Sequence, residues 1–154
     1  MLPIKAPLGP QIVSVSEESN LTAADQLMKS SKGLSLVVLN ENKEICGLLS
    51  GRNISEALLA KNGEKKIKAL LSSAFLVVFK DTLLKDLCQR MMNESFAGFF
   101  ISHQGHIEAV ICSEELLKII HHLVVKIPES SSLDDPFFKA TVGQYLENRQ
   151  AFGA

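Results

Sequence analysis

The spacing of hydrophobic residues along the chain predicts the same succession of elements twice. Short apolar runs at residues 12–15 and 75–79 are typical of β-strands, and a stretch with helical periodicity follows each of them. The apolar positions of these stretches are Leu21, Ala24, Leu27 and Met28 in the first, and Leu84, Leu87, Met91 and Met92 in the second. Ser19 or Asn20 is suited to cap the first helix. The pattern therefore indicates a strand and then a helix in each half.

A strand, a polar turn and a second strand come next in each half. In the first half these strands are residues 37–40 and 45–50, and in the second they are 99–102 and 107–112. Both pairs are related by an offset of 62 residues, measured from residue 37 to 99 and from residue 50 to 112. An internal repeat of this kind organises the whole chain.

A second helix is predicted after each hairpin, from about Asn53 to the C-cap signal at Gly63, and again from about Ser113. Each unit then reads β-α-β-β-α, which places the chain in the α/β (α+β) fold class. A unit of this size leaves one face uncovered, so we expect the two repeats to pack on each other with pseudo-twofold symmetry. We assign residues 11–63 to repeat 1 and residues 64–126 to repeat 2.

Two segments extend this pattern. Residues 64–68 form a basic connector, which is either a solvated face or a phosphate contact. Residues 127–154 begin as a Pro- and Ser-rich linker and continue as a predicted helix at 136–149. The stripe of this helix consists of Phe138, Thr141, Val142, Tyr145 and Leu146. Because the stripe is too apolar for a free tail, we expect this C-terminal helix to dock on its own module or on a second subunit.

The second strand of each hairpin runs into a motif that is found in both halves. Repeat 1 reads GLLSGRNI from Gly47, and repeat 2 reads AVICSEEL from Ala109. Repeated in register, the motif resembles the pattern Gly-aliphatic-aliphatic-Ser/Thr-x-x-Asp of the CBS domain. Residues 11–123 thus resemble a tandem CBS pair, often called a Bateman module. Repeat 1 departs from the pattern by Asn53 in place of Asp, and repeat 2 lacks both the Gly and the hydroxyl.

This resemblance implies a regulatory module that binds an adenosine-containing ligand such as AMP, ATP or S-adenosylmethionine in the cleft between the repeats. In the family the Ser/Thr contacts a ligand phosphate, the acidic residue three positions later holds the ribose hydroxyls, and residues of the first two strands frame the adenine. The ligand-binding residues that the resemblance implies are Ser14, Val37, Gly47, Ser50, Arg52 and Asn53. The alternatives are helix capping for Ser50 and Asn53, and a surface charge for Arg52.

The second motif predicts an equivalent cleft without ligand. Cys112 places a thiol, a poor phosphate donor, where repeat 1 has a hydroxyl. Glu114 and Glu115 place two negative charges where a phosphate would approach. We therefore expect a single occupied cleft, in repeat 1, where Ser50 and Arg52 favour a phosphate. The alternative is a CBS pair that has lost its ligand and serves in dimerisation or protein–protein docking.

The composition of the chain argues against some classes of binding partner. The net charge of −1 and the 6% of aromatic residues argue against nucleic acid. The longest uncharged apolar run, residues 70–79, is half of a membrane span, and no secretory leader is visible, so we expect no membrane association and a cytoplasmic location. Cys46, Cys88 and Cys112 are dispersed in apolar stretches and are interpreted as buried free thiols.

No catalytic motif is visible, so we predict that the chain is not an enzyme. The paired histidines, His103 with His106 and His121 with His122, suggest a metal site only weakly because a zinc site needs three or four converging ligands. We also predict a homodimer with an isologous helical contact, and a regulated partner protein that the sequence does not identify. The residues expected in this contact are Leu116, Ile119, Ile120, Leu123 and Val124.

Overall fold

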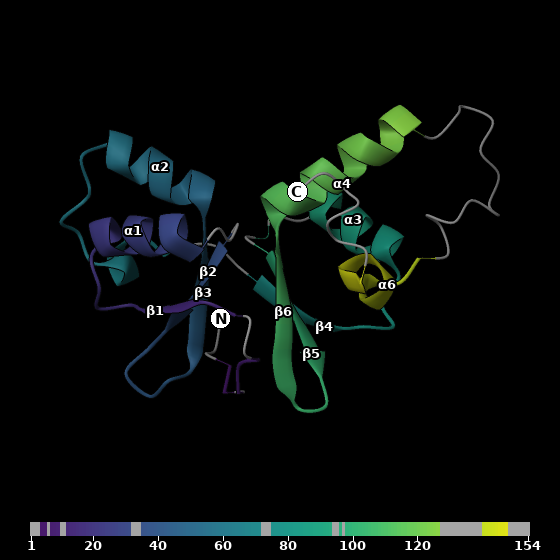
Figure 1. The fold of residues 1–154 in the computed structure, drawn as a ribbon, viewed down its shortest axis with the longest axis horizontal. Coiled ribbons are helices and arrows are strands. Elements are labelled where there is room, and N and C mark those ends of the chain that lie inside the picture. Colours follow the sequence, from purple (N-terminus) through teal and green to yellow (C-terminus); the bar gives the residue numbers. More distant parts are fainter. Residues whose placement is uncertain are drawn as a thin grey trace.

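The computed structural model describes residues 4–5, 7–9, 12–31, 35–71, 75–93, 96, 98–126 and 140–147. The strands of the two repeats lie beside each other, and the helices lie on one side of them (Figure 1). Each repeat has a sheet of three strands, in which the first two strands are parallel and the last two are antiparallel. The predicted fold class, with two β-α-β-β-α repeats, is confirmed.

The elements of repeat 1 agree with the predicted order. They are β1 (Ser14–Ser16), α1 (Leu21–Ser31), β2 (Ser35–Leu39), β3 (Ile45–Ser50) and α2 (Gly51–Leu59), followed by the 3₁₀ turn η1 (Ile67–Ala69). Asn20, one of the two predicted caps, accepts a hydrogen bond from the backbone N–H of Ala23 at 2.9 Å. Helix α2 begins at Gly51, two residues before the predicted start, because Ser50 is its N-cap.

Repeat 2 contains the same succession. Its elements are β4 (Phe75–Phe79), α3 (Leu84–Asn93), β5 (Gly98–His103), β6 (His106–Cys112) and α4 (Ser113–Lys126), and the short helix α6 (Val142–Glu147) follows. The hairpin turn between β5 and β6 has positive φ angles at Gln104 and Gly105, 52° and 81°. Positive φ at both central residues is typical of a type I′ turn, whose twist matches that of the two flanking strands.

The strand pairing corrects the repeat offset for the first hairpin strand. Val37 pairs with Leu48, whereas Phe100 pairs with Val110, so β2 corresponds to β5 at an offset of 63 and β3 corresponds to β6 at 62. Val37 and Phe100 both lie in the cluster between the repeats. The uniform offset of 62 was therefore wrong for this strand, and it would have turned each side chain of β5 to the other face of the sheet. Repeat 2 is one residue shorter in the hairpin turn.

Three hydrophobic clusters hold the molecule together. One lies between the sheet and helices of repeat 1, one lies at the equivalent place in repeat 2, and the third lies between the repeats. Gly98 allows the two repeats to approach closely, because a Cβ atom there would lie 2.5 Å from Cδ2 of Leu48 and 2.7 Å from the carbonyl oxygen of Ile111. The third cluster joins the repeats into one module.

The same backbone hydrogen bonds close both repeats. In repeat 1 the N–H of Ile67 donates to Ser19 at 2.8 Å, and in repeat 2 the N–H of Val142 donates to Thr82, also at 2.8 Å. Two further bonds and an isolated bridge repeat this correspondence. The residues from 65 to 68 are offset by 75 from their counterparts, and their bonding partners are offset by 63. The η1 segment and α6 are therefore equivalent parts of the two repeats. These bonds favour repeat boundaries beyond residues 63 and 126, and the boundaries stay a prediction.

The C-terminal helix is shorter than the predicted 136–149 in the described residues. Residues 140 and 141 are not helical, and Thr141 caps α6, since its hydroxyl accepts from the N–H of Gln144 at 3.2 Å. Val142 and Tyr145 are buried in the repeat 2 cluster, so α6 packs on its own module. Residues 136–139, with Phe138, and residues 148–149 lie outside the described residues.

Candidate functional site

The residues of the repeat 1 motif meet at the junction of β3 and α2. Ser50 ends the strand and caps the helix, because its hydroxyl oxygen accepts from the backbone N–H of Asn53 at 3.2 Å. The Asn53 side chain accepts in return from the N–H of Ser50 at 3.2 Å, which completes a capping box. The predicted alternative of helix capping therefore holds for both residues.

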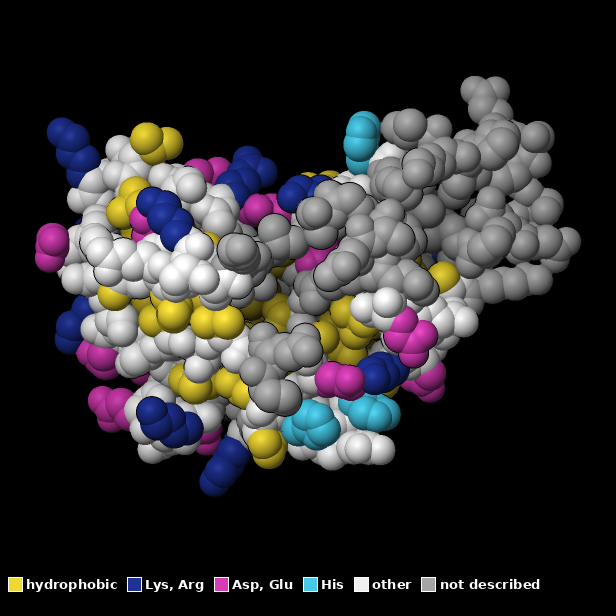
Figure 2. Space-filling model, viewed as in Figure 1, with side chains coloured by type: hydrophobic (Ala, Val, Ile, Leu, Met, Phe, Trp, Pro, Cys, Tyr) yellow, Lys and Arg dark blue, Asp and Glu magenta, His cyan; other side chains and the backbone are white. Residues whose placement is uncertain are grey.

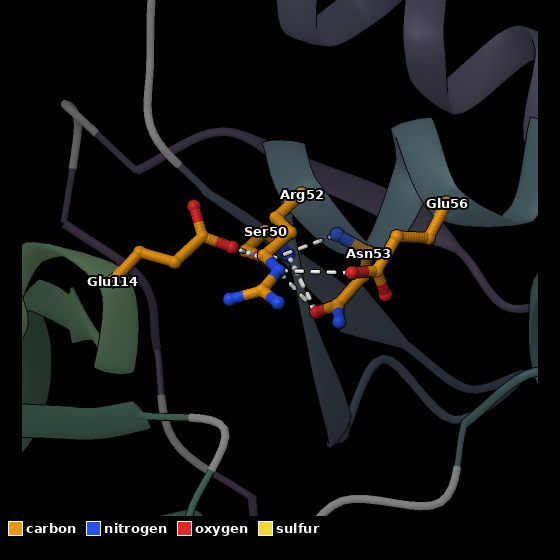
Figure 3. A network of polar contacts seen from close by, with 5 residues as sticks. All are labelled: Ser50, Arg52, Asn53, Glu56 and Glu114. Atoms are coloured by element: carbon orange, nitrogen blue, oxygen red, sulfur yellow. Dashed lines mark hydrogen bonds and ion pairs between the residues drawn. The ribbon is translucent and has the colours of Figure 1, made fainter.

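A carboxylate of the other repeat also reaches Ser50. Glu114, from the first turn of α4, accepts the Ser50 hydroxyl at 2.6 Å, while Oδ1 of Asn53 lies 2.9 Å from the same hydroxyl (Figure 3). A serine hydroxyl has one proton, so it donates to one of these acceptors at a time. The shorter contact to a charged oxygen is the stronger one. Ser50 is 5% exposed and Glu114 is half-buried, so this contact between the repeats is partly shielded from water.

Arg52 already has a partner on its own helix. Its Nε donates to Oε1 of Glu56 at 2.9 Å, and both side chains are well exposed. The hydrogen bond and charge of Glu56 raise the pKa of Arg52 above its ordinary value, and the more distant charge of Glu114 acts in the same direction. The guanidinium is thus a surface cation with a carboxylate partner, which a ligand phosphate would have to replace.

A cavity of about 290 Å³ lies next to this network. Its wall exposes polar surface as well as apolar surface, and its lining residues are Leu21, Leu48, Leu49, Asn53, Glu56, Ala57, Leu70 and Leu71. Gly47 contributes indirectly, because a Cβ atom at this position would lie 2.8 Å from Cδ2 of Leu71. The volume is close to the lower end of the range of small-molecule sites, ~300–1,000 Å³. The cavity has room for one small ligand.

Larger side chains stand at two equivalent positions in repeat 2. Ile119 stands at the position of Ala57, and Tyr145 stands at the position of Leu70; both are buried. The Tyr145 hydroxyl donates to Oε2 of Glu115 at 2.5 Å, and Glu115 is the counterpart of Asn53. The side chain that would face a ligand in repeat 2 is therefore bonded to the chain itself.

The structure separates the predicted site residues into two groups. Ser50, Arg52 and Asn53 lie together at the start of α2 (Figure 3). Gly47 lies on β3, beside the cavity-lining residue Leu71. Ser14 and Val37 are paired neighbours on β1 and β2. Val37 is 1% exposed and belongs to the cluster between the repeats. Neither Ser14 nor Val37 lines the cavity.

The electrostatic expectation needs a correction. Glu114 was expected to repel phosphate from the second cleft, but its carboxylate lies on Ser50 of repeat 1. The predicted advantage of the first site for phosphate is reduced, because the Ser50 hydroxyl and the Arg52 cation both have carboxylate partners. The cause is the pseudo-twofold packing, which brings the starts of α2 and α4 together.

Sequence reasoning missed the residues that shape the cavity. Ala57 and Leu71 carry no chemical signal in the sequence, and Glu114 was assigned to the wrong cleft. A comparison of equivalent positions in the two repeats could have found Ala57. Its counterpart is the larger residue Ile119, and such an exchange indicates a difference in packing.

The other polar groups considered in the sequence analysis form no metal site among the described residues. His103 and His106 flank the β5–β6 turn, and in the part of the chain that the structure describes no three His, Cys, Asp or Glu side chains are grouped as metal ligands. Acidic and basic side chains are interspersed over the face seen in Figure 2. Lys66 and Lys68 of the basic connector both pair with Glu18 at 2.7 Å. None of the described helices has the length and apolar character to cross a membrane.

Comparisons with known proteins agree with this fold. Residues 8–60 match the CBS domain family. A CBS-domain-containing protein from Agrobacterium tumefaciens has a TM-score of 0.58 at 14% identity, over 70% of this chain and 82% of its own. An uncharacterised conserved protein from Pyrococcus horikoshii has a TM-score of 0.57 at 16% identity, over 85% of this chain and 100% of its own. The structure of CBSX2 in complex with AMP has a TM-score of 0.50 at 17% identity, over 77% and 94%. No curated protein sequence matches this chain.

Two β-α-β-β-α units that share a core between them define the class of the molecule, a tandem α/β repeat module. Residues 8–60 match the CBS domain family, and the overall fold is that of solved CBS-domain structures, consistent with a tandem CBS pair.

Proposed function

We propose that the chain is a regulatory module that binds an adenosine-containing ligand, of the class of AMP, ATP or S-adenosylmethionine, at the start of α2. The observation that carries this proposal is the cavity of about 290 Å³ beside Asn53, whose wall combines leucine side chains with polar groups. The leucine side chains suit a purine ring, and the Asn53 amide can both donate to and accept from ribose hydroxyls. The AMP complex of the structurally similar CBSX2 supports the ligand class.

The ligand would lie mainly in repeat 1, at its border with repeat 2. Every residue that lines the cavity belongs to residues 21–71, and Glu114 reaches this border from the other side. The filled counterpart in repeat 2, closed by Tyr145 on Glu115, supports one ligand per chain. This agrees with the expectation of a single occupied cleft, for a different reason: the second space is filled rather than repulsive.

A thermal-shift panel of AMP, ADP, ATP, S-adenosylmethionine and cyclic dinucleotides tests the proposal. A ligand at 100 times its dissociation constant adds about 2.7 kcal/mol to the free energy of unfolding. For a domain of this size the expected rise in Tm is about 5–10 °C.

Ala57→Ile gives the decisive variant, because it copies the residue that fills the space in repeat 2. We expect this variant to fold and to lose the ligand-induced shift. Ala60→Ile is the matched control, since Ala60 is exposed just beyond the last turn of the same helix. A shift that survives Ala57→Ile would place the ligand elsewhere, and no shift with any ligand would contradict the proposal.

A ligand-free scaffold is the second candidate function. The hydrogen bond between Ser50 and Glu114 favours it, because the hydroxyl implied as a phosphate contact is bonded within the chain. The two functions differ in one measurement: a scaffold shows no shift in the panel, whereas a ligand-binding module does.

The further properties we propose are a homodimer, a regulated partner protein, a cytoplasmic location and the absence of catalysis. The three cysteines are free thiols, which agrees with a reducing compartment. CBS domains are typically regulatory, which supports a non-catalytic role.

The structure restricts the dimer contact that was expected on α4. Leu116 and Ile119 are buried within their own module and cannot contact a second subunit, so this part of the expected contact was wrong. Ile120 is only partly buried against the same cluster, and the side chains of Leu123 and Val124 lie outside the described residues. We propose that a dimer uses the outer face of α4, where Leu117 is 51% exposed.

A further inference from the structure

The border of the cavity carries an acidic group that comes from the other repeat. Glu114 on α4 accepts the hydroxyl of Ser50, the N-cap of α2, at 2.6 Å (Figure 3). A helix N-terminus with a free hydroxyl would normally attract an anion. Here the carboxylate of the chain already occupies that position. An incoming phosphate would have to displace Glu114 or lie beside it.

The other charges near the cavity do not compensate for this carboxylate. Arg52 is the cation of the network, and it is paired with Glu56 at 2.9 Å. Glu56 itself lines the cavity. The residues of the network thus contribute two carboxylates and one guanidinium, a net charge of −1. A positive group on a ligand is attracted to this border, and a phosphate is repelled.

The size of the cavity decides which part of a ligand meets these charges. The cavity of about 290 Å³ is small for a ligand site, and leucine side chains form much of its wall. A nucleoside fills such a volume, so its 5′ substituent, either a phosphate group or the sulfonium chain of S-adenosylmethionine, emerges at the acidic border, where charge discriminates between the two.

We propose that this site selects a neutral or positively charged nucleoside ligand, such as adenosine or S-adenosylmethionine, and discriminates against nucleotide phosphates. The inference rests on the proposed function, because it assumes that the cavity beside Asn53 is the ligand site. Glu114 is the specificity-determining residue, and it acts on a ligand held mainly by repeat 1.

Calorimetric titration with adenosine, S-adenosylmethionine, AMP and ATP tests the proposal on the wild-type chain and on Glu114→Gln. The Gln amide can still accept the Ser50 hydroxyl, so this variant removes the charge and keeps the hydrogen bond. Glu41→Gln is the matched control: it removes the same charge from an exposed residue at the turn between β2 and β3, at the other end of β3 from Ser50. Thermal melts of all three proteins serve as the control that each of them is folded.

In the wild-type chain we expect adenosine and S-adenosylmethionine to bind more tightly than AMP and ATP. In Glu114→Gln the affinity for AMP should rise about tenfold, as expected for the loss of one like charge near the phosphate. The affinity for S-adenosylmethionine should fall, and that for adenosine should change less than about twofold. Glu41→Gln should leave all four affinities unchanged.

The titrations distinguish failure of the selectivity from failure of the proposed function. Tighter binding of AMP than of adenosine to the wild-type chain, or an unchanged ratio of the two affinities in Glu114→Gln, overturns the selectivity and leaves the proposed function standing. Failure of all four ligands to bind either protein overturns the proposed function as well, and with it this inference.

Discussion

The hydrogen bond between Tyr145 and Glu115 gives a sharp test of the role of α6. Both side chains are 4% exposed, and the hydroxyl donates to the carboxylate at 2.5 Å. Tyr145→Phe removes this donor and keeps the ring that fills repeat 2. The substitution therefore isolates the hydrogen bond from the packing.

The expected loss follows from the charge and burial of the acceptor. Hydrogen bonds to charged groups contribute about 1.5–3 kcal/mol, and a buried carboxylate that loses a donor is not rehydrated. We expect the free energy of unfolding to fall by about 2 kcal/mol. For a domain of this size that corresponds to a decrease in Tm of about 4–8 °C.

Thermal and urea unfolding followed by far-UV circular dichroism measure this loss. Glu115→Gln and the double variant complete a double-mutant cycle, in which we expect a coupling of more than about 1 kcal/mol. Tyr145 is the only tyrosine and the chain has no tryptophan, so the tyrosine fluorescence of the wild-type chain reports on α6 alone. The fluorescence transition should coincide with the loss of secondary structure, because α6 belongs to the repeat 2 core.

Three results would refute this reasoning. The first is a change of less than about 0.5 kcal/mol in Tyr145→Phe, the size typical of a surface substitution. The second is a coupling energy near zero. The third is a fluorescence transition well below the main unfolding transition, which would show that α6 leaves the module first.

Two further predictions concern the interface between the repeats and the basic connector. Gly98→Ala should lower the free energy of unfolding by about 1–3 kcal/mol in urea titrations, because its Cβ atom has no space beside Leu48; an unchanged midpoint would contradict this. Hydrogen bonds from Lys66 and then Lys68 lower the pKa of Glu18 to about 2. Because this pKa is below that of the unfolded chain, the resulting stability is present above about pH 5 and is lost as the pH falls towards 2. Glu18→Gln should therefore flatten the pH dependence of Tm in this range, and identical pH profiles for the two proteins would refute it.

The arrangement of strands and helices could be predicted because each element carries its own periodicity. The run 75–79 is β4 as predicted, and the apolar positions of α1 that point to the core, Leu21, Ala24 and Met28, are buried. The internal repeat also predicted that the two halves have the same topology, which no single element shows. The offset of the first hairpin strand was wrong because β2 and β5 are both runs of apolar residues, and such runs can be aligned equally well after a shift of one residue. Only the pairing of Phe100 with Val110 reveals it.

Only the contacts of the candidate site between residues close in sequence could be predicted. The capping box of Ser50 and Asn53 depends on residues three positions apart, and the sequence contains that spacing. The bond from Ser50 to Glu114 joins residues 64 positions apart, and it depends on how the repeats pack. The bond from Tyr145 to Glu115 depends on a connection in repeat 2 that is longer than its counterpart in repeat 1. No periodicity carries that information.

The difference between the repeats comes from a few exchanges at equivalent positions. Ala57 is replaced by Ile119, and Leu70 by Tyr145, so the space that stays open in repeat 1 is filled in repeat 2. Asn53 is replaced by Glu115, a buried carboxylate that needs a donor, and the hydroxyl of Tyr145 is that donor. The three exchanges depend on one another, because Glu115 without Tyr145 would lose a donor in the core.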